Sequence, residues 1–510
     1  MLIRSRALAS VAVIAIASSL GAPAWAESLR DAIALAYQTN PSILAQRANQ
    51  RALDESIVQA RAGLRPSLDV TATGDYTRSR FPNQTSLVDT DGDGIPDTPV
   101  TTDSSESESL GASVGLSQTI YSGGRIGHGI TAAEANILAG RENLRDIEQS
   151  VLASVIQAYA DVLRDTEILR IRQENLTVLQ RQLDESSARF EVGEITRTDV
   201  AQSEARLAQS EADLANAQAQ LSVSRASYAA VVGQSPTSLE PMPVLPGIPA
   251  DFDSALDVAI QDNPGIRAAN YTLQAAEANV AAAKSEYLPS ARLTASYGGG
   301  SNDFGDLNIA DRTTFRAGAS ISVPLFTGGL NSSRVAQQLE RANAAQINVE
   351  GERRNTLQAV SSAYAQTISA RATLQAGDEA VRAATVAAEG VRQEAQVGLR
   401  TTLDVLNQEL ELRSAQVTLA SARRNEYVAQ AQLLAAMGRL EGPDLDPSLE
   451  AYDPADNYNR IRNRGALPWD GVIESIDRIA TPPVVPATDA ADAPIDQQLK
   501  SEVIQTAPRT

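Results

Sequence analysis

Two related stretches hold the residues of this chain that are best suited to chemistry: VGEITRTDV at 192–200 and VGLRTTLDV at 397–405. Both carry Gly, Thr and Asp at the same spacing. Gly favours the left-handed conformation that ends a helix, and Thr-x-x-Asp is a capping-box pattern that begins the next helix. Each stretch is therefore predicted to be a tight turn between two helices, with turn and capping residues at Gly193, Thr196 and Asp199 and at Gly398, Thr401 and Asp404.

The two aspartates admit two interpretations. In the simpler one, Asp199 and Asp404 only satisfy backbone amides and the helix dipole. If copies of the chain bring their second turns together around an axis, a ring of Asp404 carboxylates would bind cations and repel anions. Arg400, on the same turn, could then pair with a carboxylate of a neighbouring turn and hold the constriction closed.

A third acidic stretch, DTDGDGIPDT at 89–98, follows the spacing of a calcium-binding loop. The residues that would supply oxygen ligands are Asp89, Asp91, Asp93 and Asp97, with the backbone carbonyl of Ile95. The glutamate that closes an EF-hand loop is absent, because Val100 stands at that position. A weak Ca²⁺ site in an extracellular loop and a plain acidic turn both fit this pattern.

The remaining composition argues against catalysis and against nucleic acid as a partner. The chain of 510 residues has no cysteine and a single histidine, and its formal net charge is −20. Since the usual sets of nucleophile and base are missing, we expect no enzyme and no required cofactor. An acidic surface repels nucleic acid, so no partner of that class is expected.

Residues 1–26 have the pattern of a secretory signal peptide, since Arg4 and Arg6 precede an apolar run that ends in AWA. The exported chain is expected to begin at Glu27. No later apolar run approaches the ~20 residues of a membrane-spanning helix. Entry into a membrane would therefore require a β-barrel.

The exported chain is predicted to be an internal duplication. TNPSILAQRA at 39–48 resembles DNPGIRAANY at 262–271, and IYSGGR at 120–125 resembles LFTGGL at 325–330. The first copy carries an insertion between about 77 and 110, which includes the acidic stretch. The expected divisions are a first repeat at 27–234, a Pro-rich linker at 235–249, a second repeat at 250–440 and a partly disordered C-terminal extension at 441–510.

Each repeat is predicted to contain a helix, two strands, a very long helix and a return helix. The strand segments alternate apolar and polar residues over about ten positions, which suits a sheet with lipid on one side and water on the other. No Pro interrupts 124–192, so one helix can fill it, and apolar residues recur every seven positions as in a coiled coil. The first helix, 41–63, and the return helix, 197–232, should stack along it because their lengths together roughly match.

The strand count predicts the assembly. Four strands cannot close a barrel with room inside, and open sheet edges are not tolerated in lipid. Three chains would supply twelve strands and twelve helices in cross-section. The predicted fold is therefore an α+β membrane protein, a trimeric twelve-stranded β-barrel continued by a long α-helical coiled-coil barrel.

The motif VGLRTTLDVL at 397–406, the YSGG and FTGG turns and the duplicated layout resemble the TolC-type outer-membrane channels of efflux and type I secretion. The resemblance implies a homotrimer in the bacterial outer membrane, with its helical part in the periplasm. The implied partners are a periplasmic adaptor (membrane fusion) protein, an inner-membrane ABC, RND or MFS pump, and outer-membrane lipid. The alternative function is a soluble periplasmic coiled-coil scaffold or adaptor.

The resemblance also implies roles for single residues at the turns. Asp404 would be the selectivity carboxylate of a periplasmic gate, and Arg400, Thr198 and Asp199 would belong to the network that closes it. The family often has a second Asp one turn later, where this chain has Asn407. A second charged ring is therefore not expected, and cation binding at the gate should be weaker.

Overall fold

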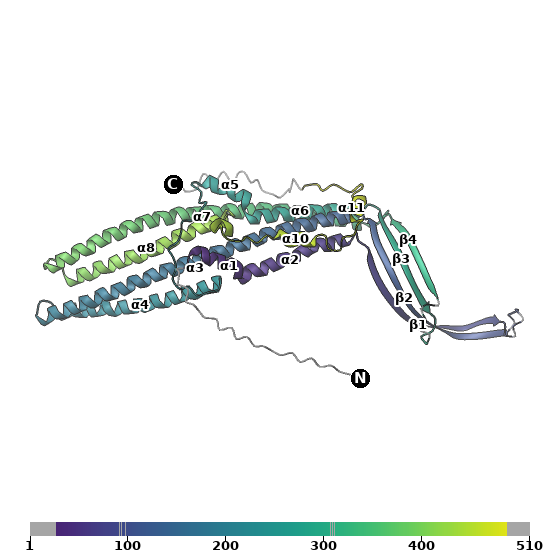
Figure 1. Ribbon diagram of the computed structural model, residues 1–510, viewed down its shortest axis with the longest axis horizontal. Helices are drawn as coiled ribbons and strands as arrows, with labels where there is room; N and C mark the ends of the chain where they lie inside the picture. The colour runs from purple at the N-terminus through teal and green to yellow at the C-terminus, as the bar shows by residue number, and fades with distance from the viewer. Residues whose placement is uncertain are drawn as a thin grey trace, which may run out of the picture.

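The computed structural model describes residues 27–486, except for positions 91, 93, 97, 306, 307, 309 and 311. The predicted signal peptide and residues 487–510 lie outside the described residues. Long helices form a rod, and a four-stranded sheet continues it at one end (Figure 1). Among the helices of the described part, none combines the length and the apolar character that crossing a bilayer requires.

The same order of elements occurs twice along the chain. The first set is α1 (Leu29–Thr39), α2 (Pro41–Ala62), β1 (Ser67–Val88), β2 (Thr98–Tyr121), α3 (Arg125–Glu191) and α4 (Arg197–Val232). The second set is α5 (Phe252–Asp262), α6 (Pro264–Ser285), β3 (Ser290–Ser301), β4 (Thr313–Ser322), α7 (Leu330–Gln396) and α8 (Thr402–Ala436). Three short helices follow: α9 (Gly442–Leu445), α10 (Ala455–Ile461) and α11 (Asp470–Asp477). The sequence prediction lacks the short helices α1 and α5 that open each set.

Two asparagines explain why the return helices stack end to end with α2 and α6. Asn40 caps α2 by accepting the amide of Ser42 (2.9 Å), and its side-chain NH₂ donates to the carbonyl of Val231 (2.9 Å) near the end of α4. Asn263 makes the matching bond to the carbonyl of Ala436 at the end of α8 (3.0 Å). As a result, α2 and α4 both lie along α3 (Figure 1), which is the stacking that the helix lengths predict.

The four strands form one antiparallel sheet in the order β1–β2–β3–β4. Residues paired across the strands share a face, and adjacent rows alternate between the two faces. One row is apolar and consists of Val70, Val114, Tyr297 and Phe315. The next row, on the opposite face, consists of Asp69, Gly115, Ser296 and Arg316. The sheet therefore has one apolar face, which is exposed in the chain, and one polar face.

The first strand pair is longer than the sequence predicts. β1 and β2 have 22 and 24 residues, whereas β3 and β4 have 12 and 10, so the expectation of about ten residues per strand is wrong for the first repeat. The inserted segment is rich in Thr and Ser, and it extends both strands beyond the common sheet. The register shifts between Arg80 and Gln84, and the hairpin bends away from the sheet (Figure 1).

The largest apolar core lies where α1, α3, α4 and α8 meet. Tyr159 and Tyr228 are fully buried there, with ring centroids 6.3 Å apart. The Tyr228 hydroxyl donates to Oε1 of Glu27 (2.6 Å), and the Tyr159 hydroxyl donates to the backbone carbonyl of Glu27 (3.0 Å). Residue 27 is thus a part of this core.

The C-terminal extension runs beside the first set of elements. α10 packs against α2, and α11 packs against β2 and α3. The Arg47 guanidinium lies between the rings of Tyr37 and Tyr452, 4.3 and 4.6 Å from their centroids. Further along, Asp477 accepts hydrogen bonds from the amide (2.5 Å) and the hydroxyl (3.1 Å) of Ser122. The extension therefore ties the helical rod to the turn between β2 and α3.

Candidate functional site at the helix tips

The two Gly-Thr-Asp turns lie at the end of the rod opposite the sheet (Figure 1). α3 and α7, with 67 residues each, lead to them, and α4 and α8 return. Gly193 and Gly398 follow the long helices with left-handed φ angles of 79° and 81°. A helix of this length spans roughly 100 Å, so the turns are far from the sheet.

Each turn is closed by the same set of hydrogen bonds. Oδ2 of Asp199 accepts from the backbone amide (2.9 Å) and the hydroxyl (2.8 Å) of Thr196. Oδ2 of Asp404 accepts from the backbone amide (3.0 Å) and the hydroxyl (2.9 Å) of Thr401. In return, each threonine hydroxyl accepts the amide of its aspartate. The aspartates therefore act as helix caps, whatever else they do.

The same bonds control the charge of the two aspartates. Donation from the backbone and the hydroxyl of Thr196 lowers the pKa of Asp199, and donation from Thr401 lowers the pKa of Asp404. The positive charge of Arg400 lowers the pKa of Asp404 further. Both carboxylates are therefore anionic at neutral pH.

Arg400 is bound within its own turn in this chain. Its Nε donates to Oε2 of Glu394 at 2.8 Å, and this bond raises the pKa of Arg400. The side chains of Arg400 and Glu394 are 50% and 47% exposed, so the ion pair is weak and can exchange partners. Arg189 and Glu194 form the corresponding pair at the first turn (3.1 Å). A contact from Arg400 to a neighbouring chain stays a prediction.

The other two residues of the predicted gate lie on the return helices. Thr198 is exposed in the first turn of α4. Asn407 lies one turn after Asp404 on α8, and its Oδ1 accepts a hydrogen bond from Nη2 of Arg206 on α4 (3.1 Å). This bond joins the two helical hairpins, and the sequence analysis does not single out Arg206.

Two ion pairs extend this junction toward the middle of the rod. Arg424 of α8 donates from Nε to Oδ1 of Asp161 of α3 at 2.8 Å, and Nη1 of Arg413 lies 3.6 Å from Oε2 of Glu174. We call these two pairs and the Arg206 bond the hairpin seam. The seven-residue apolar repeat predicts packing within a hairpin. It does not indicate that Arg424 contacts Asp161, which lies 263 positions away in the sequence. The sequence analysis therefore missed the seam.

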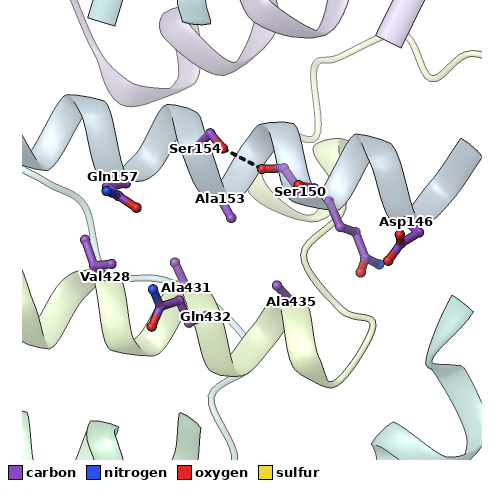
Figure 2. Close-up of a pocket in the computed structure, with 10 residues that line it drawn as sticks. Asp146, Ser150, Ala153, Ser154, Gln157, Val428, Ala431, Gln432 and Ala435 are labelled. Atoms are coloured by element: carbon purple, nitrogen blue, oxygen red, sulfur yellow. Dashed lines mark hydrogen bonds between the residues drawn. The ribbon is translucent and has the colours of Figure 1, made fainter. Parts of the chain in front are cut away.

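A pocket of about 320 Å³ lies between α3 and α8 (Figure 2). Small and amide side chains contribute much of its lining, among them Ser150, Ala153, Gln432 and Ala435. Burial raises the pKa of Asp146 at one end of the pocket. Such a polar hollow can hold water, so the two hairpins meet here through a less tightly packed interface than the apolar core.

The acidic stretch at 89–98 lies at the end of the long β1–β2 hairpin. Asp89 accepts hydrogen bonds from the amides of Gly92 and Gly94 at 2.7 and 2.8 Å, and Ile95 is exposed. Among the described residues, no group of His, Cys, Asp or Glu side chains has the arrangement of a metal site. The other aspartates of the predicted Ca²⁺ site lie outside the described residues: Asp91, Asp93 and Asp97.

The fold defines a class of outer-membrane channels. Its features are a rod formed by two repeated sets of helices, a sheet with one apolar face, and a pair of turns at the opposite end of the rod. The chain belongs to the outer membrane efflux protein family, whose model matches residues 32–234 and 255–439. It is 33% identical to the outer membrane efflux protein BepC of Brucella suis biovar 1, over 89% of this chain and 93% of that protein. It is 28% identical to the outer membrane protein TolC of Vibrio cholerae, over 85% of this chain and 95% of that protein.

The fold agrees with solved structures of such channels. The Campylobacter jejuni CmeC outer membrane channel is similar with a TM-score of 0.69, over 89% of this chain and 97% of that chain, at 16% sequence identity. The predicted α+β channel fold, the outer-membrane location and the function as an exit channel are therefore confirmed. The family is a class of transport channels, and the alternative of a soluble scaffold is wrong.

Proposed function

We propose that three copies of this chain form the exit duct of a tripartite efflux or type I secretion system. The three sheets join into a twelve-stranded barrel in the outer membrane, and the helices form a tube in the periplasm. The duct conducts its cargo passively. An inner-membrane pump of the ABC, RND or MFS type supplies the energy and reaches the duct through a periplasmic adaptor.

The observation that carries the proposal is a sheet with one exposed apolar face and two open edges. Among the described strands, β1 pairs only with β2, and β4 pairs only with β3. Unpaired backbone groups are costly in lipid, so both edges need partners there. Pairing β4 of one chain with β1 of the next would satisfy both edges of the common four-stranded part of the sheet, and twelve strands leave room for a pore.

The gate of the proposed duct lies at the helix tips. Three copies of Asp404, anionic at neutral pH, would line the narrowest point and attract cations. Arg400 is held by an exposed ion pair and can turn to a neighbouring hairpin, where Thr198 and Asp199 are its proposed partners. Asn407 adds no charge, so the proposal contains a single ring of aspartates.

A second proposal concerns the other end of the molecule. The β1–β2 hairpin projects away from the helices, so its end would be extracellular (Figure 1). We propose that residues 89–98 bind Ca²⁺ weakly there, since extracellular sites of this type work at millimolar concentration. Conduction itself requires no cofactor in this proposal.

Two measurements test the duct. The purified protein in detergent should have the mass of three chains by light scattering, and in planar lipid bilayers it should form cation-selective channels. A monomer that stays soluble without detergent and conducts no ions would contradict the proposal.

A matched pair of variants tests the placement of the sheet. Phe315→Asp puts a charge on the apolar face of β4 and should reduce outer-membrane assembly, because a charged side chain facing lipid is costly: roughly 2–4 kcal/mol for Lys or Arg at the bilayer centre, and somewhat less for Asp. Thr314→Asp puts the same charge on the polar face and should assemble normally. Equal assembly of the two variants would contradict the proposed orientation of the sheet.

A further inference from the structure

The amphipathic helix α11 has a wider apolar surface than the rest of the chain covers. Ile473 and Asp477, one turn apart, are buried against the body of the protein. At about 100° per residue, Trp469, Val472 and Ile479, which lies just after the helix, fall on the adjoining side. These three side chains are 46%, 61% and 62% exposed. This side of the apolar arc is therefore largely uncovered by the described residues.

α11 lies where the rod meets the sheet (Figure 1). The hydroxyl of Tyr121, at the end of β2, donates to the backbone carbonyl of Ile479 (2.9 Å). A register shift between Thr119 and Tyr121 pairs Tyr121 with Ala291. Ala291 in turn pairs with Ile321, which is 74% exposed on the apolar face. Because paired residues share a face, the end of α11 lies on the apolar side of the sheet, at its helical end.

In the second repeat, no counterpart of α11 among the described residues covers the junction between the sheet and the long helix. Leu325 and Phe326 occupy the positions that Ile120 and Tyr121 have in the first repeat. They are 93% and 90% exposed, whereas Ile120 and Tyr121 are half-buried. In the first repeat, α11 lies against this place and presents its own apolar side chains. Both repeats therefore expose apolar side chains at the junction between the sheet and the long helices.

We propose that α11 lies on lipid, as a short interfacial anchor at the periplasmic boundary of the outer membrane. The inference rests on the proposed placement of the sheet in that membrane. Lipid is the occupant because the exposed side chains of α11 adjoin the apolar face of the sheet, which is itself the lipid face. Amphipathic helices lie in this manner at the headgroup level, where a tryptophan ring is favoured.

The contact from Asp477 to Ser122 gives the anchor a mechanical role. It connects α11 to the turn at which strand β2 becomes helix α3. An anchor fixed at this turn would hold the height of the channel in the membrane while the far ends of the helices move.

The fluorescence of Trp469 can show whether α11 lies in lipid or in water. The sequence has two tryptophans, and the other, Trp25, falls in the predicted signal peptide. The full exported chain, produced from Glu27, therefore contains a single indole. In proteoliposomes of phosphatidylethanolamine and phosphatidylglycerol that contain phosphatidylcholine spin-labelled near the headgroup, the label should quench most of the Trp469 emission. Iodide in the buffer should quench little of it.

Three variants in a Trp469→Phe background serve as matched controls. Val472→Trp, on the proposed lipid side of α11, should be quenched by the labelled lipid. Arg478→Trp, an exposed position about 120° from Val472 and 180° from Trp469 around the helix, should be quenched by iodide instead. Phe315→Trp, on the apolar face of the sheet, reports separately whether the sheet lies in lipid.

The outcomes separate this inference from the proposed function. If lipid quenches Phe315→Trp but only iodide quenches Trp469, α11 lies in water, and the inference fails while the duct stands. If neither quencher reaches Trp469, a second copy or residues 487–510 cover α11, and the inference fails in the same way. If lipid quenches neither position, the placement of the sheet fails and the inference falls with it.

Discussion

Arg424 and Asp161 form the shortest ion pair across the hairpin seam, and we predict that its loss favours opening of the duct. Arg424 donates to both carboxylate oxygens of Asp161, at 2.8 and 3.4 Å. The side chains are 19% and 21% exposed, and Arg164 stays 2.9 Å from Asp161 when Arg424 is removed. Hydrogen bonds to charged groups contribute roughly 1.5–3 kcal/mol to stability. Partial exposure to water and the remaining Arg164 contact place the contribution of the Arg424–Asp161 pair near the lower value. Arg424→Ala should therefore weaken the seam by about 1.5 kcal/mol per chain, or about tenfold in the ratio of open to closed hairpins.

Planar-bilayer recordings of the purified channel would measure this change as a larger open fraction. Arg423→Ala is the matched control, because its partner Asp378 lies on α7 in the same hairpin, 3.4 Å away and more than half exposed. If the two seam residues act through their contact, adding Asp161→Ala to Arg424→Ala should change the open fraction little further. An open fraction of Arg424→Ala no larger than that of Arg423→Ala would refute the reasoning.

The remaining predictions concern the tips and the acidic stretch. Asp404→Ala should lower cation selectivity, whereas Asp199→Ala, which removes an equivalent cap, should not; equal effects would leave capping as the whole role of Asp404. Because hydrogen bonds hold the pKa of Asp404 below its ordinary value, wild-type selectivity should persist as the pH falls past about 3.9 and disappear only below it, as reversal potentials would show. Arg400→Ser should raise the conductance by loosening the tip, and an unchanged conductance would count against a latch. Asp91→Ala combined with Asp93→Ala should abolish Ca²⁺ binding measured by calorimetry, and retained binding would remove the proposed site.

The helical frame could be predicted because its signals are local in the sequence. Uninterrupted helical sequence between the YSGG turn and Gly193 predicts one helix over 124–192, and α3 runs from Arg125 to Glu191. Asn40 and Pro41 mark the start of α2 in the same way. Alternating residues in the strands predicted which face of the sheet is apolar, because side-chain direction in a strand depends only on the residue's parity.

The parts that could not be predicted depend on contacts between distant segments. Nothing near Arg424 in the sequence indicates Asp161 as its partner. The Thr- and Ser-rich insertion has no apolar pattern, and its strand structure depends on pairing between β1 and β2. The sequence therefore predicts strands that are too short. Likewise, the position of α11 follows from the contact of Asp477 with Ser122, which a helical pattern alone does not contain.

The two turns that lead from strand to long helix differ in their surroundings. At the first turn, a side chain on Gly123 would come within 2.7 Å of Leu288, and one on Gly124 would overlap Thr481 of the C-terminal extension. At the second turn, a side chain on Gly328 or Gly329 would meet no described atom closer than 4.0 Å. The left-handed φ angles of 60° at Gly328 and 85° at Gly329 still favour glycine, so free space alone does not make these positions tolerant. The packing of the C-terminal extension thus adds a second demand for glycine at the first turn, which the second turn lacks within a single chain.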